Sequence, residues 1–571
     1  TEKEAGLAKT IFRPSQFKPK GDIIEYFEVG KRRYIEVSKN LYNAMTGLNE
    51  TGSGLMVKIL SVPAHTLRTG ATITPEFMAR NFIRDQFTGF IQTRFGFKPF
   101  VDSAEGIAAI MGKTEIYYDW MRSGGAYSGI VELSRTNLKK TLMELRGQKN
   151  LLKRLNIISH AQDISQLFEQ ATRIGAYKAA KRTGLSDIEA GFESRESTLD
   201  FARKGARTKD VNAVIAFFNA GIQAADKSVR VAKEDPLGFA TKCVASITVP
   251  SVISYLANRN NPEYRELPRW QKDLFWMFQL GDTWVRIPKP FAYGQIFGSI
   301  PERFMEYFDS KDPEAFEGLG ESVMESLSPV GTDIASAIIP TGLQPLIENA
   351  TNWNFFLKRN IVPPYQARLL PAEQYKKYTS ETAKGIGRVL NTSPAKIENI
   401  TRGWFGGTGG YALEAGDVFL NAIKKLKGEE LEPERPPEPA DYPLIRGFTA
   451  RPAYSGTSQS VQDFYNKTRK INQEYNTYVK LLKEGKKAEA EKLKEKYPEW
   501  RYAKVLNRYS DAMSRVSQQI DKIIQSDYTV EQKRELINKY EKLRVGMAQA
   551  ANEFLKKQST QKKKVIPNLF E

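Results

Sequence analysis

The sequence is poor in the side chains that most metal and nucleophilic sites require. Its 571 residues include one cysteine, Cys243, and two histidines, His65 and His160, which lie far apart. A single cysteine excludes an intrachain disulfide and a cysteine-cluster zinc site. Because histidine is the commonest metal ligand and the usual general base near neutral pH, its scarcity argues against metallohydrolase and Ser-His-Asp chemistry.

Catalytic and cofactor motifs are also lacking. The glycine-rich run from Gly403 to Gly410 is not followed by the lysine and hydroxyl residue of a phosphate loop, so we interpret it as a structural turn. No Gly-x-Ser-x-Gly elbow, His-Glu-x-x-His helix or calcium loop occurs. Carboxylate pairs such as Glu193 and Glu196 are expected by chance among 66 acidic residues. We therefore predict that the protein is not an enzyme and has no metal or cofactor.

Long hydrophobic runs are absent, but two segments carry no charge: Val211 to Ala225 and Cys243 to Asn258. Each has about fifteen residues, whereas a spanning helix needs about twenty, and Pro250 interrupts the second. The simpler interpretation is two buried core helices. The alternative is that they enter a bilayer or line a channel after a conformational change. The candidate residues for contact with the bilayer or the channel are Val214, Ile215, Phe217, Phe218, Val249 and Ile253.

The remaining composition indicates a folded, basic protein. Hydrophobic residues make up 41% and charged residues 26%, which is ordinary globular usage. The net charge of +19 favours a polyanionic partner such as nucleic acid or an anionic membrane, or else solvated basic faces. Candidate phosphate contacts are Arg80, Arg84, Arg230, Lys233, Lys562, Lys563 and Lys564. For Arg80 and Arg84, charge pairs to neighbouring helices are the simpler expectation. If the uncharged segments are core, we expect solvated side chains for Lys227, Arg230, Lys233 and Lys242.

The first half of the chain is predicted to be a short hairpin followed by helices. Apolar and polar residues alternate from Ile23 to Val29 and from Arg33 to Val37, around a turn at Gly30-Lys31. From Leu41 to Ala257 the apolar spacing of three and four residues predicts amphipathic helices. Thr74 followed by Pro75 is a typical helix start.

The composition of the second half of the chain changes twice. Between Arg286 and Phe448, frequent prolines predict short helices joined by extended connectors, with no long helix. The acidic, proline-rich run from Gly428 to Asp441 predicts an exposed linker. From Ser458 onward we expect three long polar helices, broken near Gly485, Pro498 and Asp527-Tyr528. Their apolar stripe consists of Val461, Phe464, Ile471, Tyr475, Tyr478 and Leu482.

These patterns predict a mainly α, elongated multi-helix protein in five parts. Residues 1–70 form the N-terminal hairpin and lead-in helices, and residues 71–285 form a helical domain. Residues 286–427 form a proline- and glycine-rich domain of short helices. Residues 428–457 are the linker, and residues 458–571 form a basic C-terminal helical hairpin or bundle. The chain begins at Thr1 rather than at methionine, so we expect a processed protein or a piece of a longer polypeptide.

Several phrases, taken in order, resemble a group of phage proteins. They are Thr74–Phe77 with Arg80–Gln86, Glu196–Gly205, Arg286–Phe291, and Leu343–Glu348 with Asn352. This pattern, over most of residues 70–420, resembles the large polyvalent-protein-associated domains of phages, in particular the thirty-eighth of that series, and internal virion proteins of podoviruses. The resemblance implies part of a giant phage protein that travels with packaged DNA, sometimes beside enzyme domains. The chain shows no recognisable enzyme module, so enzymatic functions are not carried over.

The leading hypothesis is an internal virion, or ejection, protein that is delivered with the genome and helps form a conduit for DNA across the host envelope. It would lie in the head interior or tail lumen, and in the host envelope or cytoplasm after ejection. Expected partners are portal, tail or other ejection proteins, further copies of itself, phage DNA bound without sequence preference, and the host membrane. One alternative is a nucleic-acid-coating or anti-defence module of a polyvalent protein. The other is a virion-associated peptidoglycan hydrolase.

Overall fold

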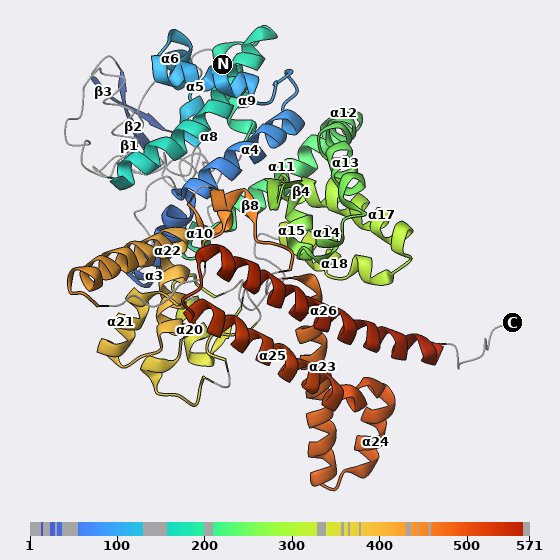
Figure 1. The fold of residues 1–571 in the computed structure, drawn as a ribbon. Helices are drawn as coiled ribbons and strands as arrows, with labels where there is room; N and C mark the ends of the chain where they lie inside the picture. The colour runs from blue at the N-terminus through green and yellow to red at the C-terminus, as the bar shows by residue number, and fades with distance from the viewer. Residues whose placement is uncertain are drawn as a thin grey trace, which may run out of the picture. The chain divides into compact units, whose positions relative to one another are not determined.

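The computed structural model is mainly α-helical, as the sequence predicted (Figure 1). It describes residues 13–14, 23–28, 31–36, 55–128, 157–198, 209–327, 339–355, 359–363, 366–375, 379–429, 436–443, 445–454 and 458–563. The chain forms two compact units, each of which combines distant parts of the sequence. Unit 1 contains residues 1–248, 290–297 and 319–429, and unit 2 contains residues 249–289, 298–318 and 430–571. This division differs from the five consecutive parts predicted.

A small antiparallel sheet lies at the start of unit 1. It consists of β1 (Arg13–Pro14), β2 (Ile23–Glu28) and β3 (Lys31–Glu36), in the order β1-β2-β3. The register pairs Glu28 with Lys31 and Ile23 with Glu36. The predicted hairpin is therefore confirmed, with the second strand beginning two residues earlier than expected. Of the predicted turn, Lys31 is the first residue of β3, and Gly30 lies outside the described part of the chain.

The first helices of unit 1 pack around aromatic residues. They are α3 (Leu55–Thr72), α4 (Pro75–Gln92), α5 (Val101–Gly112), α6 (Glu115–Arg122), α8 (Ile157–Arg182) and α9 (Asp187–Glu196). The predicted helix start is confirmed, because Thr74 stands at the N-cap position of α4 and Pro75 is the first residue of the helix. Trp120 and Tyr177 are buried in the core that α5, α6, α8 and α9 share. A Cβ at Gly106 of α5 would lie 2.1 Å from the Ala171 carbonyl oxygen of α8, so glycine permits this close packing.

The remaining elements of unit 1 include one helix that the sequence did not predict. The elements are α10 (Lys209–Val214), α11 (Phe218–Glu234), α12 (Pro236–Cys243), α16 (Phe291–Gly294), α18 (Leu319–Leu327), α20 (Gln344–Thr351), β6 (Trp353–Asn354), β7 (Arg359–Asn360), α21 (Glu381–Leu390) and α22 (Pro394–Leu426). The expectation of only short helices is wrong for α22, which has 33 residues. Its only proline, Pro394, stands in the first turn, where proline is tolerated.

The glycine-rich run predicted to be a turn is a kink within α22. Only Gly406 leaves the helical conformation, at φ 58° and ψ −137°. Glycines on both helices allow α22 to approach α3 closely, since a Cβ at Gly406 would lie 3.2 Å from the Ala71 nitrogen, and a Cβ at Gly70 of α3 would lie 2.0 Å from the Phe405 carbonyl oxygen. The glycines therefore serve helix packing rather than a connection between elements.

Unit 2 contains a small sheet with helices around it. Its elements are α13 (Val249–Asn258), α14 (Pro262–Glu266), α15 (Arg269–Leu274), β4 (Phe275–Leu280), β5 (Thr283–Pro288), α17 (Ile300–Ser310) and β8 (Thr449–Ala450). The strand order is β4-β5-β8, with Trp284 paired to Ala450. Ala450 and Ala453 are buried beside Phe275 and Met277. The last part of the predicted exposed linker is thus packed into a core, because it supplies an edge strand.

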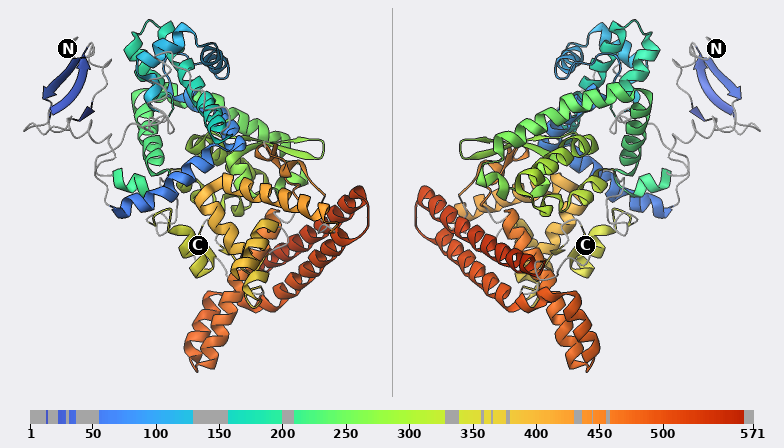
Figure 2. Two further views of the ribbon diagram at one scale, coloured as in Figure 1. Left: turned by 90° about the vertical axis from the view of Figure 1, so that its left-hand side faces the viewer. Right: turned by 90° about the vertical axis from the view of Figure 1, so that its right-hand side faces the viewer.

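The C-terminal helices of unit 2 follow the predicted pattern. They are α23 (Gln459–Lys483), α24 (Lys487–Lys496), α25 (Ala503–Gln525) and α26 (Val530–Lys563). The breaks fall at Gly485, which has a φ of 76°, at Pro498, and between Gln525 and Val530, as expected. Figure 2 shows α25 and α26 as an antiparallel pair. Of the predicted stripe, Val461, Phe464 and Ile471 are buried, Tyr475 packs against their core, Tyr478 stacks on Trp500, and Leu482 is exposed.

Candidate membrane-interacting helix

One continuous helix, Pro236–Asn258, is long and apolar enough to cross a membrane, and it is the only such helix in the described part of the chain. It consists of α12, the π-helical turn η3 (Val244–Thr248) and α13. The helix starts at Pro236, where the Asp235 side chain accepts a hydrogen bond of 3.0 Å from the Gly238 amide. This arrangement is a favourable cap for the first turn.

Pro250 does not end this helix, contrary to what the sequence suggested. A proline within a helix lacks the amide hydrogen, and its ring collides with the carbonyl four residues earlier. Here the turn before Pro250 is widened to a π-helix, which relieves that collision. The uncharged segment is therefore helical from Cys243 to Asn258, and α12 lengthens it to 23 residues.

The buried face of α13 contains Tyr255 of the unit 2 core and three polar residues. Ser251, Ser254 and Asn258 are buried in unit 2. Ser251 Oγ accepts a hydrogen bond of 2.7 Å from Trp276 Nε1, and Asn258 Nδ2 donates to the Met277 carbonyl at 2.9 Å. Buried polar groups are stable only when their hydrogen bonds are satisfied, and these are. The inward face of α13 is thus fixed by specific polar contacts.

The outward face of the helix is apolar. Ile253 is 58% exposed and Leu237 is 78% exposed, and the exposed residues between and beyond them include Val244, Val249 and Leu256. Only 22% of the most apolar 18-residue window is buried. The prediction of a buried core helix is therefore wrong for this segment. The buried side of the helix combines apolar residues such as Ile247 with the polar residues of α13, whereas large apolar side chains lie on its exposed side, so the exposed face is suited to an apolar environment.

The other uncharged segment does not form one helix. α10 ends at Val214 and α11 begins at Phe218, and Phe217 between them has a φ of 64°. Val214 and Ile215 are half-buried, as are Phe217 and Phe218. The Thr341 amide donates to the Val214 carbonyl at 3.0 Å. This segment is neither a buried core helix nor a candidate span, so only Val249 and Ile253 of the predicted membrane residues lie on a suitable element.

The arginines proposed as phosphate contacts interact mainly with other residues of unit 1. Burial lowers the pKa of Arg84 to about 10, and its guanidinium stacks 4.5 Å from the centre of the Phe291 ring. Arg80 Nε donates to the Glu76 carbonyl at 3.1 Å. Arg230 pairs with Asp226 at 3.0 Å and with Glu196 at 3.1 Å. These contacts bind the arginines within unit 1.

The lysines expected to be solvated or to contact phosphate differ in burial. Lys227 is buried and pairs with Glu196 at 2.8 Å, so its side chain is not solvated, whereas Lys233 is exposed. Lys562 and Lys563 lie in the last turn of α26, and Lys564 lies outside the described residues. Lys233 is therefore the predicted phosphate contact whose described side chain is exposed.

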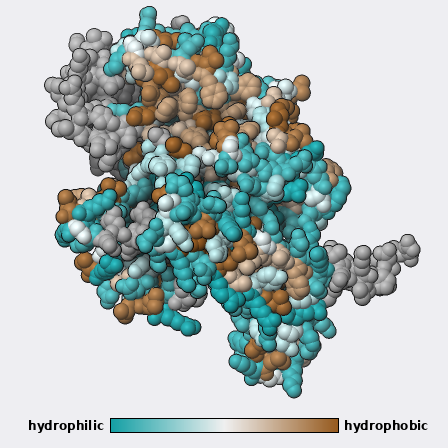
Figure 3. Space-filling model, in the orientation of Figure 1, coloured by the Kyte–Doolittle hydropathy of each residue, from teal (hydrophilic) through white to brown (hydrophobic). Residues whose placement is uncertain are grey.

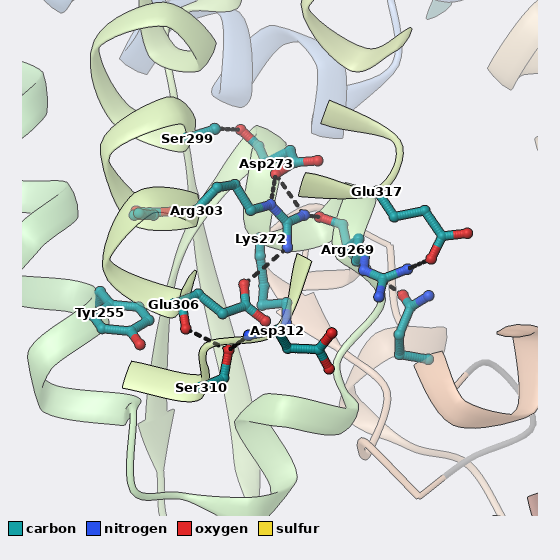
Figure 4. A network of polar contacts seen from close by, with 12 residues as sticks. Tyr255, Arg269, Lys272, Asp273, Ser299, Arg303, Glu306, Ser310, Asp312 and Glu317 are labelled. Atoms are coloured by element: carbon teal, nitrogen blue, oxygen red, sulfur yellow. Dashed lines mark hydrogen bonds and ion pairs between the residues drawn. The ribbon is translucent and has the colours of Figure 1, made fainter. Parts of the chain in front are cut away.

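Sequence reasoning missed a buried network of charges in unit 2 (Figure 4). Arg303 is 2% exposed; its Nη2 lies 2.8 Å from Asp273 Oδ1 and its Nη1 lies 3.1 Å from Glu306 Oε2. Burial lowers the pKa of Lys272 nearby. Burial opposes the ionisation of Glu306, but the charges of Lys272 and Arg303 lower its pKa below the usual value. The network holds α15 to α17, and no pattern in the sequence distinguishes these charges from solvated ones.

The protein is thus mainly α-helical and exposes an apolar face of the helix Pro236–Asn258. Residues 261–443 match the family model of large polyvalent protein associated domain 38. This match confirms the resemblance over those residues and implies a phage polyvalent protein. The Arg286–Phe291 and Leu343–Glu348 phrases lie inside the match, whereas the phrases near Thr74 and Glu196 lie outside it. No curated protein and no solved structure matches the chain.

Proposed function

We propose that this phage polyvalent protein is an internal virion protein, ejected with the genome, that contributes to a DNA conduit in the host envelope. The observation that carries the proposal is the helix Pro236–Asn258, with its exposed apolar face and its length of 23 residues. The net charge of +19 adds attraction to anionic lipid and to DNA. The protein acts in this role without catalysis, as a homo-oligomer beside portal, tail or other ejection proteins.

Membrane association is tested with the full chain and liposomes that contain anionic lipid and a trapped dye. The wild-type protein is expected to bind and to release dye. Val249→Asp with Ile253→Asp is expected to reduce both at least tenfold, because each aspartate costs about 2.5–3.5 kcal/mol at the centre of a bilayer. Both positions are already exposed, so the variant keeps its fold. The control is Val389→Asp, which adds one of the same two charges at an exposed valine on α21.

The outcomes separate the proposed conduit from its alternatives. A protein that never binds liposomes at any salt concentration or pH contradicts the proposal, and DNA protection by that protein would favour a nucleic-acid coat. Equal loss of leakage in Val389→Asp would assign the effect to net charge instead of to the helix. Incubation with purified peptidoglycan is expected to release no soluble fragments. Release that disappears on substitution of one acidic residue would establish the hydrolase alternative.

A further inference from the structure

A second exposed apolar stripe runs along the last four turns of α22 in unit 1. Phe419 is 66% exposed and Leu426 is 87% exposed. The exposed residues recur at alternating intervals of three and four, namely Ala412, Ala415, Phe419, Ala422 and Leu426, with Val418 beside them at 72%. Figure 3 shows hydrophobic residues on the surface of the left-hand lobe, where Figure 1 places α22. This spacing is typical of a seam between two helices.

The opposite side of α22 is already occupied by α21. Asp417 Oδ1 accepts hydrogen bonds from Ser380 Oγ at 2.6 Å and from the Thr382 amide at 2.7 Å. A Cβ at Gly416 would lie 2.3 Å from Thr382 Oγ1, so the two helices touch there. Lys424 Nζ lies 3.2 Å from Glu381 Oε2. These contacts fix the rotation of α22, and the apolar stripe therefore faces outward.

The stripe is complementary to itself in shape. When a second copy of α22 runs antiparallel, with its centre between residues 420 and 421, Phe419 of each copy faces Ala422 of the other. In the same register Leu426 faces Ala415. Each large side chain thus meets a small one, which allows the helices to pack closely. An antiparallel arrangement also closes the pair, because both copies use the same surface.

The charges at the edge of the stripe favour the same register. Glu414 and Lys425 are exposed on one edge and are eleven residues apart, which is about three helical turns. In an antiparallel pair that edge meets its own copy, so Glu414 of each chain comes near Lys425 of the other. Phe419, Leu426 and Val418 together offer on the order of 400 Å² of exposed surface per copy, or roughly 800 Å² per pair. The alanines and the edge residues bring this near the roughly 1,000 Å² of a specific interface.

We propose that α22 binds a second copy of this chain through this stripe, as an antiparallel helix pair. The α22 pair supplies one contact surface of the homo-oligomer in the proposed function. The inference therefore rests in part on that function. Its test needs neither membrane nor DNA, so the two proposals can fail separately.

The test is sedimentation velocity of the full chain over a range of concentrations. The wild-type protein is expected to show a concentration-dependent dimer. Phe419→Asp is expected to raise the dimer dissociation constant at least about 30-fold, as for a central interface residue. Glu414→Lys and Lys425→Glu are each expected to weaken the dimer, and the double variant is expected to recover most of the loss. The control is Leu370→Asp, which changes an exposed leucine elsewhere in unit 1.

Circular dichroism checks that each variant keeps its helical content, which is expected because every position changed is exposed. A wild-type monomer at all concentrations overturns the proposal. So does a dimer that Phe419→Asp leaves unchanged. A double charge variant that is weaker than both single variants rejects the antiparallel register.

Discussion

Replacement of Arg303 by methionine tests whether the buried charges of unit 2 act as one unit. The guanidinium makes two hydrogen bonds to Asp273 Oδ1, at 2.8 and 3.1 Å, and one to Glu306. Asp273 is 3% exposed, so removal of the cation leaves a buried carboxylate without its partner. Removal of one member of a buried ion pair costs about 3–5 kcal/mol. Arg303→Met should therefore destabilise the contact between α15 and α17 by that amount.

Hydrogen exchange is the appropriate measurement because a chain with two units does not unfold in a single step. Amides of α17 should exchange roughly 100 to 4,000 times faster in Arg303→Met, since about 1.4 kcal/mol corresponds to tenfold. Arg303→Met with Asp273→Asn should recover much of the protection, because the lone charge is gone. Arg122→Met, which removes an exposed ion pair with Asp119 in unit 1, should cost no more than about 1 kcal/mol. A change below about 1 kcal/mol in Arg303→Met would refute this reasoning.

Two further predictions concern unit 1. Burial and then the charge of Glu169 raise the pKa of Asp85 to about 8. The folded state thus holds a proton that the unfolded chain releases, so stability should fall as the pH rises from about 4 to about 8. Asp85→Asn should show a smaller fall in melting temperature between pH 5 and pH 8, and an equal fall contradicts the assignment. Gly406→Ala should lower unfolding stability by about 1–3 kcal/mol, because only glycine adopts its φ and ψ without strain. Gly385→Ala, in an open helical position of α21, should be neutral or stabilising, and the reverse order in denaturation would count against this account.

Local chemistry made parts of the fold predictable. Gly485 and Pro498 end helices because of their own backbone properties, so the breaks between the C-terminal helices could be read from the sequence. The N-terminal hairpin was predictable for a similar reason, since its two strands are adjacent and alternate in polarity. In these cases the residues that determine the structure lie within a few positions of it.

Structure that depends on distant partners was missed. Strand β5 pairs with β8, so Val285 lies opposite Thr449, and no local sequence pattern predicts that pairing. Glycines of α22 allow close packing against distant parts of the chain, such as Ala71 of α3 at Gly406 and Thr382 of α21 at Gly416. Arg303 was indistinguishable from a surface arginine, because its burial depends on α15. The apolar composition of Pro236–Asn258 was visible, but which face is buried depends on Trp276 and Met277.

The helix Pro236–Asn258 and the stripe on α22 have different roles in the proposed conduit. A single helix of 23 residues is about 35 Å long, which is enough to cross the hydrocarbon core but not to surround DNA. A conduit therefore needs several copies, and the polar residues of α13 already make internal contacts in each one. The closed pairing through α22 joins two copies and uses no residue of the helix Pro236–Asn258. A ring of more copies then needs a further contact, which the portal, tail or other ejection proteins of the proposed assembly are suited to supply.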